Sequence, residues 1–352
     1  MIQCQIKLRP NAKREQTLDD WLWTLTGVYN WAIRKIGQDA KGGVYYTALG
    51  FQNLLADHAK KIGIPSHTMQ GVLATAYQSW QRCFRKKGGR PKLKGHRRPL
   101  NSIPFPDPIR RPEGHYIKLP MLGAVRFHKQ EIPEGKIKCG RLIRRPSGWY
   151  LCLFIDVDRT PIERRGFGEI GIDPGFKDLL AFSNGEKIEH PAELKRSEVR
   201  LAQAQRGRRK KLTARIHERI ANQRKDRNHK ISLRLVQENT LIAFSKDNHR
   251  AVAKRFGKSV TSAAHAQLRA QLAYKSLAGG TQYVEVNSRN STRTCSSCGC
   301  LTGPTGLSGL AERQWQCTDC GAKHDRDTNA ACNTLLLGLG RPSNDGGSRY
   351  VA

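Results

Sequence analysis

Acidic residues are scarce in this sequence, which contains 29 Asp and Glu against 62 Lys and Arg in 352 residues, a formal net charge of +33. A chain with so much charge of one sign repels itself unless a polyanion neutralises it, so the composition favours a nucleic-acid partner. Long apolar runs are also missing, because no stretch reaches the ~18 consecutive apolar residues that a membrane-spanning helix needs. The N-terminal MIQCQIKLRP lacks the apolar segment of a signal peptide. We therefore expect a cytoplasmic protein without a membrane partner.

Cysteine is not arranged as a disulfide framework, since four of the ten Cys form two Cys-x-x-Cys pairs and the others are scattered. The pairs are Cys295 with Cys298 and Cys317 with Cys320, and eighteen residues separate them. This spacing is typical of a zinc ribbon, in which four thiolates complete the tetrahedron that Zn²⁺ prefers. A closed site of this kind leaves no position for water, so we assign it a structural role. Cys300 breaks the pairing and is interpreted as a bystander.

The N-terminal part of the chain reads as one strand followed by helices. Residues 2–8 alternate between polar and apolar types, and a helix is predicted after the Arg-Pro-Asn break. Its apolar stripe is Leu18, Trp21, Leu22, Leu25, Val28, Tyr29 and Ile33. A second helix is predicted over 69–84. The aromatic residues Trp21, Trp23, Tyr29 and Trp31 are expected to lie in the core.

A basic segment follows, with nine Lys or Arg and no acidic residue between positions 82 and 98. A solvated charge run is the ordinary interpretation of such a segment, but the lack of any compensating acid favours contact with phosphates. The candidate nucleic-acid contacts here are Arg85, Lys86, Lys87, Arg90, Lys92, Lys94, Arg97 and Arg98. Residues 117–127 and 136–156 read as strands that could form a small barrel with the first strand.

The pattern changes after residue 165. Segments 169–173 and 179–183 predict a hairpin, 193–230 a long helix and 240–244 an apolar strand, which together indicate an α/β sheet. The helical segment carries fourteen Lys or Arg, so it is either a nucleic-acid contact or an exposed surface helix. Its candidate contacts are Arg208, Arg209, Lys210 and Lys211.

Three carboxylates stand out near the ends of these elements. Asp173 lies in GIDPG at the end of a predicted strand, and Asp325 and Asp327 lie in HDRDTNAACN at the start of a predicted helix. An Asp at a turn is most often a cap. If the fold brings these residues together, their oxygens could bind the pair of divalent cations that assists phosphodiester hydrolysis.

GIDPG, LAYKSLAGGTQYVEV, the two cysteine pairs and HDRDTNAACN occur in an order that resembles the TnpB family, the RNA-guided nucleases of insertion sequences related to type V CRISPR effectors. IKLRPN, VYNWAI and GGRPKLKG resemble the same family less specifically. The resemblance implies RuvC motifs around Asp173 and Asp327, with Mg²⁺ as the catalytic ion and Zn²⁺ in the ribbon. It also implies a guide RNA and a double-stranded DNA target beside a short motif, bound in a prokaryotic cytoplasm at the nucleoid.

The fold implied is α/β with a small β-barrel. It comprises a RuvC or RNase H-like domain with an inserted zinc ribbon, and an N-terminal barrel with a helical insertion. The expected boundaries are a wedge-like barrel at 1–10 and 90–165, a helical recognition lobe at 11–89, a RuvC-like domain at 166–288 and 321–340, the ribbon at 289–320 and a tail at 341–352.

The sequence departs from the family at the second RuvC carboxylate, where a Glu is usual. Ser245 occupies that position in LIAFSKDN, and Ser288 occupies the place of a displaced Glu found in some relatives. Glu285 is the candidate substitute, although it also matches a structural Glu of relatives with the usual site. A Ser hydroxyl cannot offset the charge of two cations as a bridging carboxylate does.

The alternatives are therefore a weak or rearranged nuclease, or a nuclease-inactive DNA binder that acts as a transcriptional repressor. A strand transferase with a covalent Tyr is disfavoured, because no His pair accompanies a helical Tyr. A plain zinc-ribbon RNA-binding protein would leave GIDPG and HDRDTNAACN unexplained.

Overall fold

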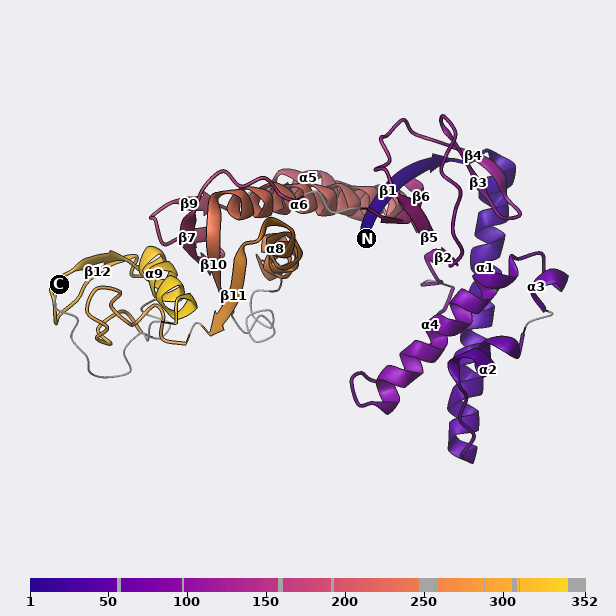
Figure 1. Cartoon of the computed structure of the whole chain (residues 1–352), viewed down its shortest axis with the longest axis horizontal. Coiled ribbons are helices and arrows are strands. Elements are labelled where there is room, and N and C mark those ends of the chain that lie inside the picture. Colours follow the sequence, from indigo (N-terminus) through magenta and orange to yellow (C-terminus); the bar gives the residue numbers. More distant parts are fainter. Residues whose placement is uncertain are drawn as a thin grey trace. The chain divides into compact units, whose positions relative to one another are not determined.

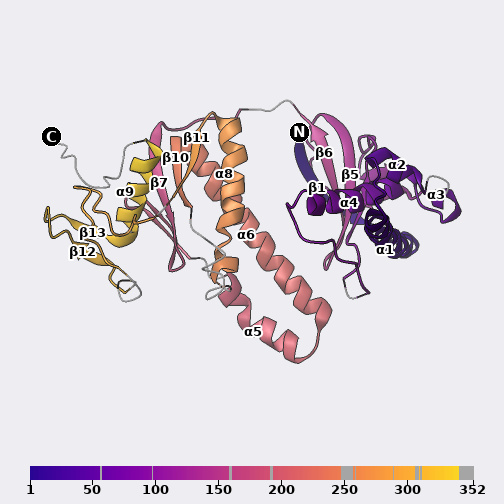
Figure 2. The same ribbon diagram turned by 90° about the horizontal axis from the view of Figure 1, so that it is seen from below.

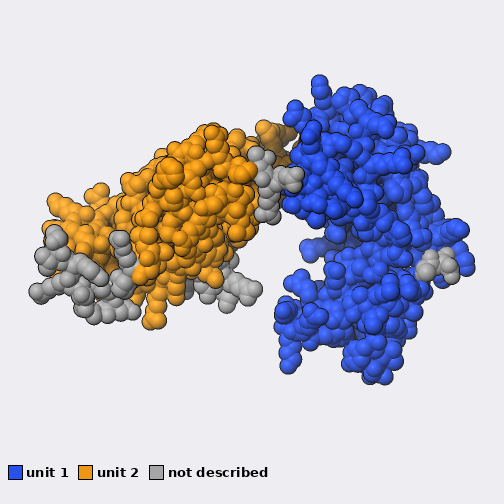
Figure 3. Space-filling model, viewed as in Figure 1, with its two compact units in different colours: residues 1–159 blue, residues 160–352 orange. Residues whose placement is uncertain are grey.

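The computed structural model describes residues 1–55, 58–96, 98–157, 161–190, 193–246, 257, 259–287, 289–305, 309 and 311–340. The chain divides into two compact units, residues 1–159 and 160–352 (Figure 3). Arg97, Ser288 and the tail 341–352 lie outside the described residues, so the expectations for them have no structural counterpart. Within the described ranges, no helix is both long enough and apolar enough to cross a membrane.

Unit 1 inserts a group of helices after its first strand (Figure 1). The helices are α1 (Ala12–Asp39), α2 (Ala48–Asn53), α3 (His58–Lys61) and α4 (Ser66–Phe84), with a 3₁₀ turn at Ala40–Gly42. The strands are β1 (Ile2–Arg9), β2 (Ser102–Phe105), β3 (Tyr116–Leu119), β4 (Gly123–Phe127), β5 (Lys136–Arg145) and β6 (Gly148–Asp156). Asn11 caps α1 by accepting a hydrogen bond from the Arg14 N–H at 2.9 Å.

The sheet of unit 1 is open, so the small barrel expected from the sequence is only half formed. Its strand order is β2-β5-β6-β1-β4-β3, and the two outer strands form no ladder with each other in the described part of the chain. β1 joins the two halves, pairing with β6 over Ile2–Lys7 and with β4 at Leu8 and Arg9. The outer strands have only four residues each, so they offer few backbone groups for closure. The result is a half-barrel.

The predicted apolar stripe of α1 lies in the core, apart from the partly buried Val28. The expectation for the aromatic residues is wrong at one position. Trp21 and Tyr29 are buried and Trp31 is partly buried, whereas Trp23 is 60% exposed. Trp23 follows two buried residues, but the helical period turns it to the outer face of α1.

Unit 2 contains a five-stranded sheet, a two-stranded hairpin and four described helices of more than four residues (Figure 2). The sheet consists of β7 (Gly168–Pro174), β8 (Asp178–Phe182), β9 (Lys187–Glu189), β10 (Asn239–Lys246) and β11 (Gln282–Asn287), in the order β11-β10-β7-β8-β9. The hairpin is β12 (Gln314–Gln316) with β13 (Lys323–Asp325). The helices are α5 (Glu193–Arg206), α6 (Lys210–Glu238), α8 (His265–Gly279) and α9 (Arg326–Gly338).

Helices cover both faces of this sheet (Figure 2). Apolar residues of α6 and α8, such as Leu235 and Leu272, share one core with Ile172 and Phe244. α9 packs on the other face, so closely that a Cβ at Gly171 would lie 2.1 Å from the Ala331 carbonyl oxygen. A glycine is therefore required in β7 where α9 crosses it.

The predicted hairpin at 169–183 is confirmed as the antiparallel pair β7 and β8. The single helix expected over 193–230 is instead two helices. The chain turns at Gly207, and Arg208 has a left-handed φ of 51°. Apolar residues such as Leu201 and Ile220 pack α5 against α6, so this burial stabilises the turn that local helix propensity would not favour.

Candidate functional site

Four cysteines gather at the loops before α9. The sulfurs of Cys295, Cys298, Cys317 and Cys320 all lie within 4.8 Å of one another. Cys295 Sγ is 3.7 Å from Cys320 Sγ, and Cys298 Sγ is 3.6 Å from Cys317 Sγ. A tetrahedral ion with Zn–S bonds of ~2.3 Å requires sulfurs ~3.8 Å apart. The cluster therefore has the size and the donor atoms for a tetrahedral metal ion.

Each cysteine pair is shaped by a glycine turn. The Gly299 N–H donates to the Cys295 carbonyl at 2.8 Å, and the Gly321 N–H donates to the Cys317 carbonyl at 3.0 Å. Both glycines have left-handed backbones, with φ of 82° and 74°. Residues with a Cβ rarely adopt this conformation, so the glycine after each pair allows the turn that points both sulfurs inward.

Polar side chains around the cluster were not identified from the sequence. The Thr302 hydroxyl donates to Cys317 Sγ at 3.1 Å. Burial disfavours the Cys317 thiolate, but this bond and the N–H groups of Cys320 and Asp319 outweigh it and lower the pKa of Cys317 to about 6. The only sequence signal for Thr302 is a hydroxyl residue shortly after a cysteine pair.

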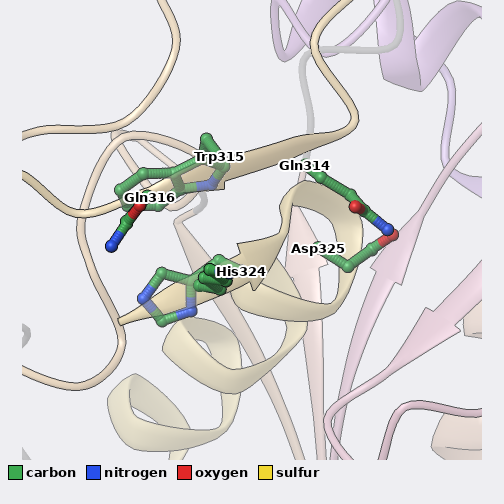
Figure 4. A pocket seen from close by; sticks show the side chains of 6 residues that line it. Gln314, Trp315, Gln316, His324 and Asp325 are labelled. Atoms are coloured by element: carbon green, nitrogen blue, oxygen red, sulfur yellow. The ribbon is translucent and has the colours of Figure 1, made fainter. Parts of the chain in front are cut away.

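His324 joins the cluster to the hairpin of β12 and β13. Its Nε2 lies 3.0 Å from Cys295 Sγ, and its ring lies 4.8 Å from the Trp315 ring between centroids. Burial lowers the pKa of His324, which favours the neutral imidazole. Figure 4 shows these rings on one side and Gln314 and Asp325 on the other. Together they border a hollow of about 450 Å³. The hollow is lined by Gln314, Trp315, Gln316, Lys323, His324 and Asp325.

Cys300 lies beside the cluster without completing it. Its thiol donates to Asp319 Oδ2 at 3.1 Å, and that hydrogen bond raises the pKa of the thiol. It forms a second, smaller group with Cys298 and Asp319. The four-cysteine set is complete without this residue.

The sheet register places Asp173 in the same line of cross-strand pairs as Lys187, which contacts the N-terminus of α9. Asp173 pairs with Ala181 of β8, and Ala181 pairs with Lys187 of β9. The Lys187 ammonium contacts Asp325 Oδ2 at 2.7 Å, and Asp325 caps α9 by accepting from the N–H groups of Asp327 and Thr328. Residues paired across strands share a face, so the fold brings Asp173 and the start of α9 to the same face of the sheet.

The two aspartates of α9 are held by cations of the chain. Burial would raise the pKa of Asp325, but Lys187 and the Thr328 N–H hold it below its ordinary value. Asp327 accepts from Arg313 Nη1 at 3.0 Å. Both carboxylates accept hydrogen bonds from basic side chains at the N-terminus of a helix, where negative charge is favoured.

Ser245 lies on the Asp173 face of the sheet. Ile172 pairs with Phe244 in the parallel ladder, so the next residues along each strand, Asp173 and Ser245, lie side by side on the face that α9 covers. Ser245 is fully buried, and its hydroxyl has no hydrogen-bond partner among the described residues.

Glu285 lies on the opposite face. It pairs with Phe244, whose side chain belongs to the core under α6 and α8. Its carboxylate accepts from Tyr283 Oη at 3.1 Å and from Arg269 of α8 at 3.4 Å. Burial and this neighbouring carboxylate raise the pKa of Tyr283. The register therefore separates Glu285 from Asp173, and the structure places it in a contact between β11 and α8.

Asp173, Asp325 and Asp327 do not form a compact group of candidate metal ligands among the described residues. Hard cations need several carboxylate oxygens, but the two groups of three or more candidate metal ligands in the described ranges both centre on the cysteines. The position beside Asp173 holds a hydroxyl that carries no charge. We derive no hydrolytic step from this arrangement.

The two basic segments form exposed turns. The segment after α4 lies along the helices of unit 1, because the Asn30 side chain donates to the Lys94 carbonyl and accepts from the Lys94 N–H, both at 2.8 Å. The described basic candidates there are all exposed. Arg208, Arg209, Lys210 and Lys211 are exposed at the turn from α5 to α6. The fold presents both segments to solvent.

Two protein-family models match segments of this chain that lie mostly in unit 2. The family described as "Cas12f1-like, TNB domain" matches residues 265–334, and the family described as "Probable transposase" (OrfB_IS605) matches residues 154–251. These ranges contain α8, the four cysteines and the start of α9, together with β7 to β10.

Individual relatives agree with these matches. A Streptomyces pristinaespiralis protein named "Putative RNA-guided DNA endonuclease" is 36% identical over 55% of this chain, which spans about half of that relative (51%). The Escherichia coli K12 protein named "Putative RNA-guided DNA endonuclease InsQ" is 23% identical over 95% of this chain and 91% of its own length. TnpB-like protein L79 of Acanthamoeba polyphaga mimivirus is 27% identical over 48% of this chain and 37% of its own length.

The fold has a counterpart among solved structures. A chain in the "Cryo-EM structure of the Cas12f1-sgRNA-target DNA complex" superposes with a TM-score of 0.58 and 15% identity, over 92% of this chain and 83% of that one. The two proteins share a fold. The family models and the named relatives thus agree with the sequence motifs in their similarity to the TnpB family.

Proposed function

We propose that this protein binds a guide RNA and uses it to bind a matching DNA duplex. The observation that carries the proposal is the match to the Escherichia coli relative, which is named an RNA-guided DNA endonuclease and aligns over nearly all of both chains. The net charge of +33 and the two exposed basic segments support it, because a protein that recognises nucleic acid through its backbone needs positive charge. The proposed place of action is DNA in a prokaryotic cytoplasm.

The four cysteines are proposed to bind one structural Zn²⁺. Four sulfurs at tetrahedral spacing match the ligands of a closed zinc site. Bound zinc would hold together the two cysteine turns and the short hairpin, which has only three residue pairs of its own. It would thereby fix the loops that precede Asp325 and Asp327.

We further propose that the protein acts by occupying DNA and not by cutting it. The supporting observation is the neutral, buried Ser245 beside Asp173, at the position where the family resemblance implies a Glu. Glu285 points away from this position and is engaged by Arg269 and Tyr283. A bound protein that does not cut would block transcription wherever its target overlaps a promoter. Weak or rearranged cleavage is the competing function.

The test is to purify the protein with its cellular RNA, sequence that RNA, and incubate the complex with a matched duplex in Mg²⁺ and in Mn²⁺. Retention and cutting are scored in the same reaction, with an unmatched duplex as control. Retention of the matched duplex alone, without cutting, is expected. Equal retention of both duplexes would contradict guided binding. Cutting that Asp173→Ala abolishes would contradict the inactive state.

A further inference from the structure

The outer face of α1 carries an exposed tryptophan that the core does not use. Trp23 is 60% exposed, whereas the other five tryptophans of the chain are buried or partly buried. His96 is its ring neighbour, with centroids 5.7 Å apart and planes crossing at 76°. The two rings therefore do not stack face to face, and most of the indole surface remains open.

One turn further along α1, Gly27 leaves the space next to Trp23 empty. A Cβ built at Gly27 would meet nothing within 4 Å, and the residue lies inside a regular helix without a positive φ. Glycine in a helix interior costs stability relative to alanine, and neither packing nor backbone conformation requires it here. A helical side chain leans back over the preceding turn, so the missing side chain of Gly27 uncovers the indole of Trp23.

Positive charge borders this open surface. The turn between Gly95 and Arg98 places His96 against Trp23. Lys94 is fixed through its backbone to Asn30, and its ammonium lies 6.0 Å from the centre of the Tyr29 ring. The Asn30 amide donates to and accepts from the Lys94 backbone, so its orientation is fixed within the protein. The surface thus offers an aromatic face and charge, and its described amide, Asn30, is already engaged.

We propose that Trp23 and the open helix face at Gly27 bind an unpaired nucleotide of the target DNA. The indole would stack on the base, the bare helix surface at Gly27 would admit the sugar, and Lys94 with Arg98 would attract the phosphates. Stacking tolerates every base, so a site without edge contacts suits DNA of changing sequence better than a constant RNA. The inference rests on the proposed function, because DNA strands separate when a guide pairs with one of them.

The test compares variants of the full chain, each purified with its RNA, on a matched duplex that contains a short unpaired segment. Trp23→Ala is expected to weaken DNA binding about tenfold, and Trp23→Phe to recover most of the loss. Gly27→Leu fills the open space and is expected to weaken DNA binding while raising the melting temperature, since leucine favours the helix. A merely structural role would not combine these two effects. Tyr116→Ala removes another exposed aromatic of unit 1, 53% exposed, as the matched control.

Each outcome is decisive. Loss of RNA from Trp23→Ala during purification would assign the surface to RNA and overturn the proposal. Unchanged DNA binding in both Trp23→Ala and Gly27→Leu, with a binding parent protein, would overturn it while leaving the proposed function intact. A parent protein that fails to retain matched DNA would refute the proposed function itself. In a fluorescence experiment, DNA but not RNA should protect Trp23 from quenching by acrylamide. This result would support the assignment of the Trp23 surface to DNA, and Trp23→Phe gives the background signal of the other tryptophans.

Discussion

Glu285 and Asp173 lie on opposite faces of the five-stranded sheet. Asp173 shares the face under α9 with Ser245, whereas Glu285 shares the face under α8 with Phe244. Strand residues alternate between faces. Val286 pairs with Ser245, and Glu285, the residue before it in β11, therefore points to the other face and cannot reach Asp173. The alternation separates the candidate substitute from the position that lacks a carboxylate.

Replacing Glu285 should therefore affect stability and leave DNA binding unchanged. Glu285→Ala removes the acceptor of Tyr283 and Arg269. We expect a loss of about 1 kcal/mol in the free energy of unfolding, because partly buried donors lose their partner. Urea denaturation measures the loss, and Tyr283→Phe serves as a milder control. A complete loss of divalent-dependent cutting in Glu285→Ala, with the fold intact, would contradict this geometry.

Restoring a carboxylate at position 245 should create affinity for divalent cations. A buried, unpaired Glu beside Asp173 would lower the melting temperature of Ser245→Glu in the presence of a chelator, because burying a charge is costly. Mg²⁺ or Mn²⁺ should raise that temperature again, since binding to the folded state stabilises it. The parent protein and Ser245→Gln, which has the size without the charge, should show little response. An equal response in all three proteins would contradict the role given to Ser245.

Removing one cysteine of the cluster should release its metal. We expect one zinc per chain in the parent protein, measured with a colorimetric chelator after denaturation, and substoichiometric zinc in Cys317→Ser. Cys300→Ser should keep the full zinc content, because the four sulfurs at tetrahedral spacing do not include Cys300. Equal zinc loss from both variants would mean that Cys300 is also a ligand.

Filling Gly171 should loosen α9 from the sheet. The methyl of Gly171→Ala would overlap the Ala331 carbonyl, so α9 must shift. We expect a loss of about 1–3 kcal/mol in the free energy of unfolding, as overpacked cores show. Gly27→Ala is the matched control, because its methyl meets nothing and should stabilise α1 by about 0.5–1 kcal/mol. Thermal unfolding of the two variants should move in opposite directions.

Lys275 should make stability depend on alkaline pH. Its ammonium is buried between α8 and α6, where it donates to the His229 carbonyl at 2.6 Å and to Ser232 Oγ at 2.8 Å. Burial lowers the pKa of Lys275 from 10.5 to about 8. Between these two pH values the unfolded chain binds more protons than the folded chain, so stability rises with pH in that window.

The comparison with Lys275→Met isolates this effect. The parent protein should gain about 3 kcal/mol relative to the variant between pH 7 and pH 10.5, because the penalty for the buried charge disappears. Urea denaturation at both pH values gives the difference. A difference that stays constant with pH would show that Lys275 is as well solvated in the folded protein as in the unfolded one.

Several features of this protein follow from the sequence alone because they are local. The two cysteine pairs, the strand that contains Asp173 and the helix that Asp325 caps depend on neighbouring residues, and each occurs in the structure close to where the pattern predicts it. The buried stripe of α1 follows from helical periodicity in the same way. The break between α5 and α6 does not, because Arg208 adopts its left-handed backbone only where burial of both helices repays the cost.

Only the tertiary structure decided which residues share a face. The sequence identifies Ser245 and Glu285, but the register of β10 against β7 and β11 places one with Asp173 and turns the other toward α8. Such outcomes depend on the element that covers each face, and a pattern along one chain segment holds no information about its distant partner.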